Sequence, residues 1–96
     1  MVQQVTVTTN APIALKPLIE AALRSELRML ELSLQRTSQR LRAFEAQYGL
    51  ASDEFERRFN VGEVEESLEF IEWAGEIETH RLLDAQQQAL QGIQLT

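Results

Sequence analysis

The sequence has no cysteine, and in 96 residues it has only two prolines, four glycines and one tryptophan. Without cysteine, disulfides and thiolate metal sites are excluded. No apolar run reaches the roughly 20 residues that a membrane-spanning helix needs. The opening residues, MVQQVTVTTN, lack the pattern of a signal peptide. These absences predict a cytoplasmic protein with no membrane segment.

Charge is divided unevenly along this single domain of residues 1–96. Residues 1–48 have six basic and four acidic side chains, for a net charge of +2, whereas residues 49–96 have three basic and eleven acidic ones, for −8. An acidic half of this strength repels nucleic acid and favours a basic protein partner. Contact with DNA is predicted to be weak at most, because the arginines that could bind it are expected to form ion pairs with Glu20, Glu31 and the acids of the second half. These arginines are Arg24, Arg28, Arg36 and Arg40.

A long helix is predicted over residues 17–48, because no glycine or proline occurs between Pro17 and Gly49. Apolar residues recur there at spacings of three and four, which is typical of a coiled-coil seam. The seam comprises Leu23, Leu27, Leu30, Leu34, Thr37, Leu41, Phe44 and Tyr48. A helix of this length is about 48 Å long, whereas a compact domain of this size has a radius of gyration of about 13 Å. The helix must therefore pack along a second helix or a second chain.

Two further helices are predicted, a short one over residues 53–59 and a long one over residues 64–91. The last helix has two apolar stripes on nearly opposite sides. If the two long helices form an antiparallel hairpin, we expect the numbers of facing residues to add up to about 112. Gly75 would then face Thr37. We expect the first stripe, with Leu68, Ile71 and Leu82, to face the seam of the first long helix.

The predicted fold is therefore all-α: an antiparallel hairpin of long helices with a short connecting helix, dimerised along the long helices like a coiled coil. Short β-strands are possible at residues 2–8, which are rich in valine and threonine, and at residues 92–96. An isolated two-stranded ribbon is only marginally stable in water.

The second stripe of the last helix, Phe70, Trp73 and Ile77, has two interpretations. It is either buried under the short helix or a second subunit, or it forms an aromatic docking surface for a basic partner. Acids surround it, as is common at a binding hot spot for a basic protein. The predicted partner-binding residues are Glu69, Phe70, Glu72, Trp73, Glu76 and Ile77.

Catalytic, cofactor-binding and metal-binding residues are not predicted. Glu65, Glu66 and Glu69 match the E-E-x-x-E half of a helical nucleotide pyrophosphohydrolase site, but the complementary E-x-x-D half is missing. His80 is preceded at the i−3 position by Ile77, so the Glu-x-x-His motif of a di-iron bundle is missing too. Two alternatives to a protein-binding module remain: such a metal-dependent hydrolase, or a purely structural coiled-coil dimerisation protein.

The stretch LQRTSQRLRAFEAQYGLASDEFERRFNVGEVEESLEFIEWAGEIETHRLL resembles a family of small prokaryotic helical proteins whose members look like antitoxins of toxin–antitoxin pairs. The family pattern is R-T-x-x-R-L-x-x-F-E-x-x-Y-G, then S-x-E-F, a short acidic stretch and D/E-F-x-E-W. The matching residues are Arg36, Thr37, Arg40, Leu41, Phe44, Glu45, Tyr48, Gly49, Glu54, Phe55, Phe70, Glu72 and Trp73. The resemblance implies a non-enzymatic inhibitor that binds a partner protein.

Overall fold

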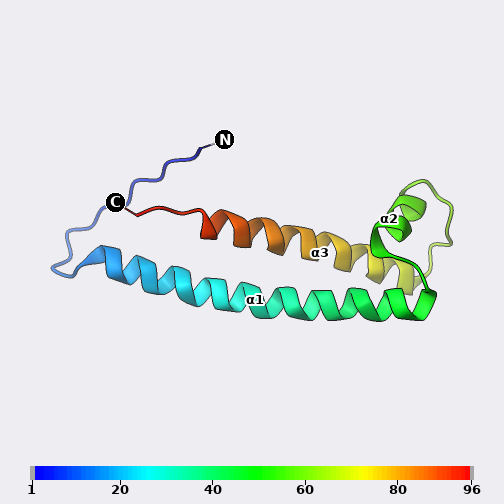
Figure 1. The fold of residues 1–96 in the computed structure, drawn as a ribbon. Coiled ribbons are helices and arrows are strands. Elements are labelled where there is room, and N and C mark those ends of the chain that lie inside the picture. Colours follow the sequence, from blue (N-terminus) through cyan, green and yellow to red (C-terminus); the bar gives the residue numbers. More distant parts are fainter. Residues whose placement is uncertain (1, 96) are drawn as a thin grey trace.

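The computed structural model describes residues 2–95, which form three helices (Figure 1). Helices α1 (Leu15–Tyr48) and α3 (Leu68–Gln91) run antiparallel as a hairpin, and α2 (Ser52–Asn60) lies at its closed end. Residues 2–95 contain no β-strand, so the prediction of an all-α fold is confirmed. The two possible strands are not formed at residues 2–8 and 92–95, and Thr96 lies outside the described residues.

Helix α1 turns its predicted seam toward α3. Leu30, Leu34 and Thr37 are buried, and the other seam residues are half-buried except Tyr48, which is 37% exposed. The one polar seam residue is satisfied within its own helix, because the Thr37 hydroxyl donates to the Leu34 carbonyl at 3.1 Å. The helix ends at Gly49, whose φ of 60° lies in the left-handed region that favours glycine.

Helix α3 begins at Leu68, four residues later than the sequence predicts. The residue before it, Ser67, is the N-cap, and its hydroxyl accepts a hydrogen bond from the Phe70 backbone N–H at 3.1 Å. Glu65 and Glu66 therefore precede the helix rather than forming its first turn.

The densest part of the core lies at the closed end, where all three helices meet around Trp73. Its indole is fully buried and stacks on the ring of Phe55 from α2, with ring centroids 3.9 Å apart and planes 3° from parallel. Phe44 from α1 stacks on the indole at 5.3 Å. The indole N–H donates to the Ser52 hydroxyl at 3.0 Å, so its polar atom is satisfied.

The prediction of which α3 stripe faces α1 is wrong. Phe70, Trp73 and Ile77 face inward, and Trp73 and Ile77 belong to the core. Leu68, Ile71 and Leu82, which were predicted to form the inner seam, are 74%, 51% and 58% exposed. The aromatic stripe is buried because only it reaches both Phe44 of α1 and Phe55 of α2.

The predicted register of the hairpin is also wrong. Contacts between α1 and α3 join Ser38 to His80 and Arg40 to Glu76, pairs whose residue numbers add up to 118 and 116 rather than 112. Gly75 is exposed and does not pack on Thr37, because a Cβ added to Gly75 would meet no atom within 4 Å.

Beyond Ile77, polar contacts between α1 and α3 accompany the buried leucines of the α1 seam. Ser38 and His80 share a hydrogen bond of 3.2 Å between Oγ and Nε2. Further along, the Gln87 side-chain amide donates to the Glu31 carboxylate at 2.9 Å. The inner side of α3 thus changes from aromatic at the closed end to polar toward the open end.

The molecule is elongated, with extents of 59 × 25 × 18 Å and a radius of gyration of 18.7 Å. The first turns of α1 extend beyond the end of α3, and the C-terminal end of the chain lies near that open end (Figure 1). Leu18, in this extension, is 53% exposed. A hairpin of this shape covers one side of each long helix and leaves the other sides exposed.

We predict that Trp73→Ala lowers the free energy of unfolding by about 3–5 kcal/mol, because it removes the ring on which Phe44 and Phe55 stack. Urea denaturation monitored by circular dichroism measures the loss. Val61→Ala is the control, because Val61 is 62% exposed, and should change the free energy by less than about 0.5 kcal/mol. Similar losses in the two variants would contradict the central position of Trp73.

Candidate functional site

The aromatic docking surface predicted from the sequence is not formed. Trp73 is fully buried, Ile77 is 8% exposed, and Phe70 is half-buried between the rings of Tyr48 and Phe55. These side chains belong to the core, so they are not available to anchor a partner. The sequence alone did not exclude this burial, and the structure assigns the stripe to it.

The three acids of the predicted docking surface have separate environments. Glu76 forms an ion pair with Arg40 of α1 at 3.4 Å. Glu69 is half-buried next to Tyr48, and its carboxylate raises the pKa of the Tyr48 hydroxyl by accepting its hydrogen bond. Only Glu72 is exposed and without an ion pair among the described residues.

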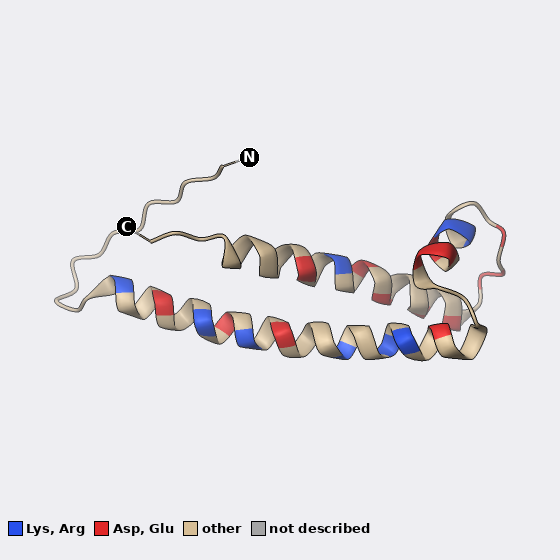
Figure 2. Cartoon of the chain, in the orientation of Figure 1, with Lys and Arg blue, Asp and Glu red and all other residues tan. Residues whose placement is uncertain are grey.

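An acidic surface nevertheless exists at the closed end, where acids precede and open α3 (Figure 2). We define the acidic end as Glu65, Glu66, Glu69 and Glu72. None of the four forms an ion pair within residues 2–95. Their charge is therefore not neutralised within the chain, which leaves a negative potential at this end of the rod.

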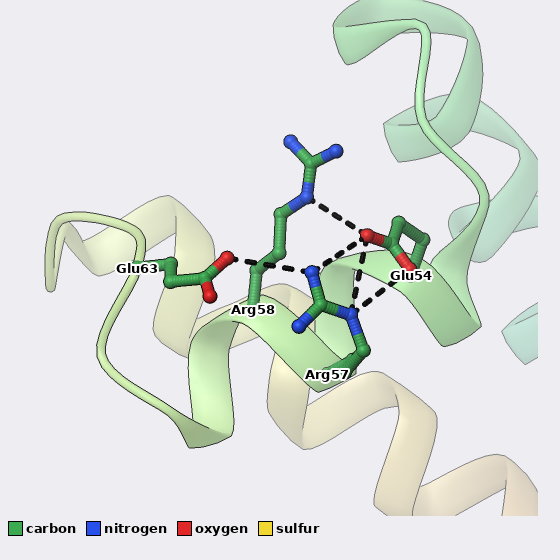
Figure 3. A network of polar contacts seen from close by, with 4 residues as sticks. All are labelled: Glu54, Arg57, Arg58 and Glu63. Atoms are coloured by element: carbon green, nitrogen blue, oxygen red, sulfur yellow. Dashed lines mark hydrogen bonds and ion pairs between the residues drawn. The ribbon is translucent and has the colours of Figure 1, made fainter.

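Glu54 of α2, by contrast, is neutralised by arginines (Figure 3). Glu54 accepts hydrogen bonds from Arg57 at 2.9 Å and from Arg58 at 3.0 Å, and Arg57 also lies 3.4 Å from Glu63. The two guanidinium groups lower the pKa of Glu54 from 4.5 to about 2. This network joins α2 to the loop that leads to α3.

The basic side chains of α1 are mostly unpaired, contrary to the expectation from the sequence. Of the four arginines expected to meet acids, only Arg40 forms an ion pair. Arg24, Arg28 and Arg36 are exposed and have no ion-pair partner in the described part of the chain. The first half of α1 has three basic and three acidic side chains, so the open end is close to neutral, whereas the closed end is acidic.

Two shallow grooves run between α1 and α3. One, of about 560 Å³, is lined by Arg40, Ala43, Phe44, Gln47, Glu72, Gly75, Glu76 and Thr79. The other, of about 460 Å³, is lined by Glu31, Leu34, Gln35, Ser38, Gln39, Arg42, His80 and Asp84. Both are open to solvent along their length and have the form of the furrow between two packed helices.

The second groove places Ser38 and His80 in hydrogen-bond contact, with Asp84 one helical turn beyond His80. Ser38 lies in the interior of α1, where backbone N–H groups bond within the helix and are not free to stabilise an oxyanion. The contact therefore joins two helices rather than forming a nucleophilic site. Residue spacing alone did not reveal this pair, because it depends on the register.

Carboxylates do not gather into a metal centre in the described part of the chain. Among residues 2–95, no group of three or more histidine, cysteine or acidic side chains is placed to hold a metal ion. Of the E-E-x-x-E residues, only Glu69 lies on α3, whereas Glu65 and Glu66 lie in the preceding loop. The regular helical spacing that the motif requires is not present.

The largest uncovered apolar feature is the outer side of α3. We define the outer stripe as the exposed residues there that repeat at helical spacing. They are Leu68, Ile71, Gly75, Glu78, Leu82, Ala85 and Ala89, so one charged residue lies in the middle of an otherwise apolar row. The stripe extends along the whole helix, on the side opposite the buried Trp73, so α1 does not cover it.

No family model, curated protein or solved structure matches the chain. Within residues 2–95, none of the helices is long and apolar enough to cross a membrane.

The Glu54 network generates a prediction about pH. The pKa of Glu54 is lowered in the folded chain, so its ionised form stabilises the fold above pH 4.5, and this stabilisation is lost as the pH falls toward about 2. We expect the melting temperature to fall over this range, and to fall less steeply in Glu54→Gln. Thermal unfolding at a series of pH values measures the difference.

The matched control for this prediction is Asp53→Asn, which removes an exposed acid from the same helix that has no ion pair among the described residues. It should leave the slope between pH 4.5 and 2 close to that of the unmodified chain. An identical pH dependence in Glu54→Gln and the unmodified chain would contradict the network.

Proposed function

We propose that the chain is a non-enzymatic protein-binding module, and that it acts as an antitoxin that neutralises a basic partner protein. The observation that supports this proposal most strongly is the balance between buried and exposed apolar side chains. The buried hydrophobic core of the described residues consists of Leu30, Leu34, Phe55, Trp73 and Ile77, and more large hydrophobic side chains are exposed than are buried.

Exposed apolar side chains that occur singly are ordinary, but those on the long helices follow the helices in rows. Leu68, Ile71 and Leu82 share the outer side of α3. Met29 and Leu32 lie close together on α1 and are 61% and 63% exposed. Long helices with apolar residues on more than one side are typical of chains that complete their packing with another polypeptide.

The charge of the molecule supports a basic partner. The net charge is −6, and the acidic end has four carboxylates that no arginine of the described residues neutralises. Leu68 lies on this same end and is 74% exposed. An apolar contact with charged groups at its rim combines affinity from burial with fast, electrostatically guided association.

The partner is tested by co-expression with the protein encoded by the adjacent reading frame. We expect that protein to stop growth when it is expressed alone, and this chain to restore growth by forming a stable complex with it. Growth arrest that co-expression does not relieve, or the absence of a complex between the purified proteins, would contradict the antitoxin proposal.

With that complex, Glu65→Gln/Glu66→Gln should slow association several-fold and weaken its dependence on salt, because rim charges act mainly on the rate of encounter. Glu20→Gln/Glu26→Gln is the matched control, since it removes the same charge from the open end. Stopped-flow association at two salt concentrations measures both. Equal effects of the two pairs would show that only net charge matters and that the acidic end has no special role.

We also propose that the chain is a homodimer, because a second copy is the simplest cover for an apolar row that extends along α3. The expected mass in solution is twice the 11.0 kDa of the chain. Light scattering coupled to gel filtration at micromolar concentration measures it, and a stable monomer under these conditions would contradict the dimer.

A further inference from the structure

When a second copy of α3 runs antiparallel to the first, large side chains of one outer stripe can face small side chains of the other. Two antiparallel copies can be aligned so that facing residue numbers add up to 156 or 157. The facing pairs are then Leu68 with Ala89, Ile71 with Ala85, and Leu82 with Gly75. In each pair a large side chain meets a small one, which is the arrangement that lets two helices pack closely.

Gly75 provides a second argument for this alignment. Glycine in a helix interior is less stable than alanine, and close packing within the chain does not explain it here, because an added Cβ would meet no atom within 4 Å. In the antiparallel pair, the missing side chain makes room for Leu82 of the second copy. Contact with another copy thus accounts for a residue that the isolated chain does not explain.

Charge favours the antiparallel direction over the parallel one. The first half of α3 has the acids Glu69, Glu72, Glu76 and Glu78, whereas its last seven residues, 85–91, are uncharged (Figure 2). Parallel copies would place the acidic halves side by side, which is repulsive. Antiparallel copies instead place each acidic half beside the uncharged last seven residues of the other copy, which avoids this repulsion.

We propose that two copies of the chain pair through the outer stripe of α3 in an antiparallel, two-fold symmetric arrangement whose axis passes between Glu78 and Thr79. This arrangement rests on the proposed homodimer and specifies its interface. The same patch serves both subunits, as a two-fold axis requires. Glu78, at the axis, forms an ion pair with Arg81, which also binds Glu56 of α2 at 2.9 Å and so offsets part of the charge there.

Cross-linking tests the arrangement directly, because the chain has no cysteine of its own. Glu78→Cys should form a disulfide between copies under mild oxidation, since Glu78 is the middle residue of the outer stripe and its two copies lie next to the axis. Leu68→Cys should not, because the two Leu68 positions would be separated by about 31 Å along the helices, whereas a disulfide needs Cα atoms within about 7 Å. Gln35→Cys on α1 is the control and should remain reduced.

The outcomes separate this inference from the homodimer itself. A Leu68→Cys disulfide would overturn the antiparallel arrangement while leaving the dimer in place. A dimer by light scattering that gives no Glu78→Cys disulfide would overturn the α3 interface. A monomer by light scattering, with no disulfide in either variant, would overturn both the homodimer and the arrangement.

A size exchange tests the register. Gly75→Leu should raise the dissociation constant of the dimer by about tenfold or more, because two leucines then compete for the space at that pair. Gly75→Leu/Leu82→Gly should restore it, since the large and small partners have merely been exchanged. Sedimentation equilibrium measures the constants, and circular dichroism verifies the helix content. An unchanged constant in the single variant, or no recovery in the double variant, would overturn the proposed register.

Discussion

The stack of Trp73 on Phe55 is the contact on which the rest of the structure depends. It joins α3 to α2, and through Phe44 it also joins both of them to α1. A fully buried indole has one polar atom that must be satisfied, and Ser52 accepts its hydrogen bond. Once these rings meet, the rotation of α3 is determined, and the outer stripe is left facing solvent.

That rotation explains which parts of the fold were predictable. The all-α class and the inner seam of α1 follow from one uninterrupted heptad pattern, with Leu30 and Leu34 at its buried centre. Local signals of this kind do not depend on the partner helix. The C-terminal end of α1 was equally predictable, because Gly49 interrupts the helical pattern in the sequence and has a positive φ in the structure.

The inner side of α3 could not be predicted in the same way. Its buried stripe continues from Ile77 into His80, Asp84 and Gln87, so it looks shorter than the outer stripe, which is apolar at every position except Glu78. The polar continuation is acceptable only because Ser38 and Glu31 on α1 provide hydrogen-bond partners. Such pairs exist in one register and not in another, and the register is set by the aromatic contacts with α2.

The candidate site, too, was predictable only in part. The sequence correctly indicates an excess of acid in the second half, but it does not indicate which acids are neutralised. Glu54 and Glu76 are neutralised by arginines, whereas Glu65 and Glu66 form no ion pair within residues 2–95, because the chain turns before α3 begins. A docking surface built on Trp73 would require an exposed indole, whereas the indole is fully buried in the core.

The change from aromatic to polar contacts along the hairpin has a consequence for the order of folding. Aromatic burial at the closed end requires only the short connection of residues 49–67 to be closed, and closing a short loop costs little entropy. Farther along the hairpin the leucine seam of α1 is less enclosed, and contacts such as the hydrogen bond between Glu31 and Gln87 are exposed to water. We therefore expect the two long helices to associate first near Trp73 and then toward the open end. Amide hydrogens at the open end should exchange first.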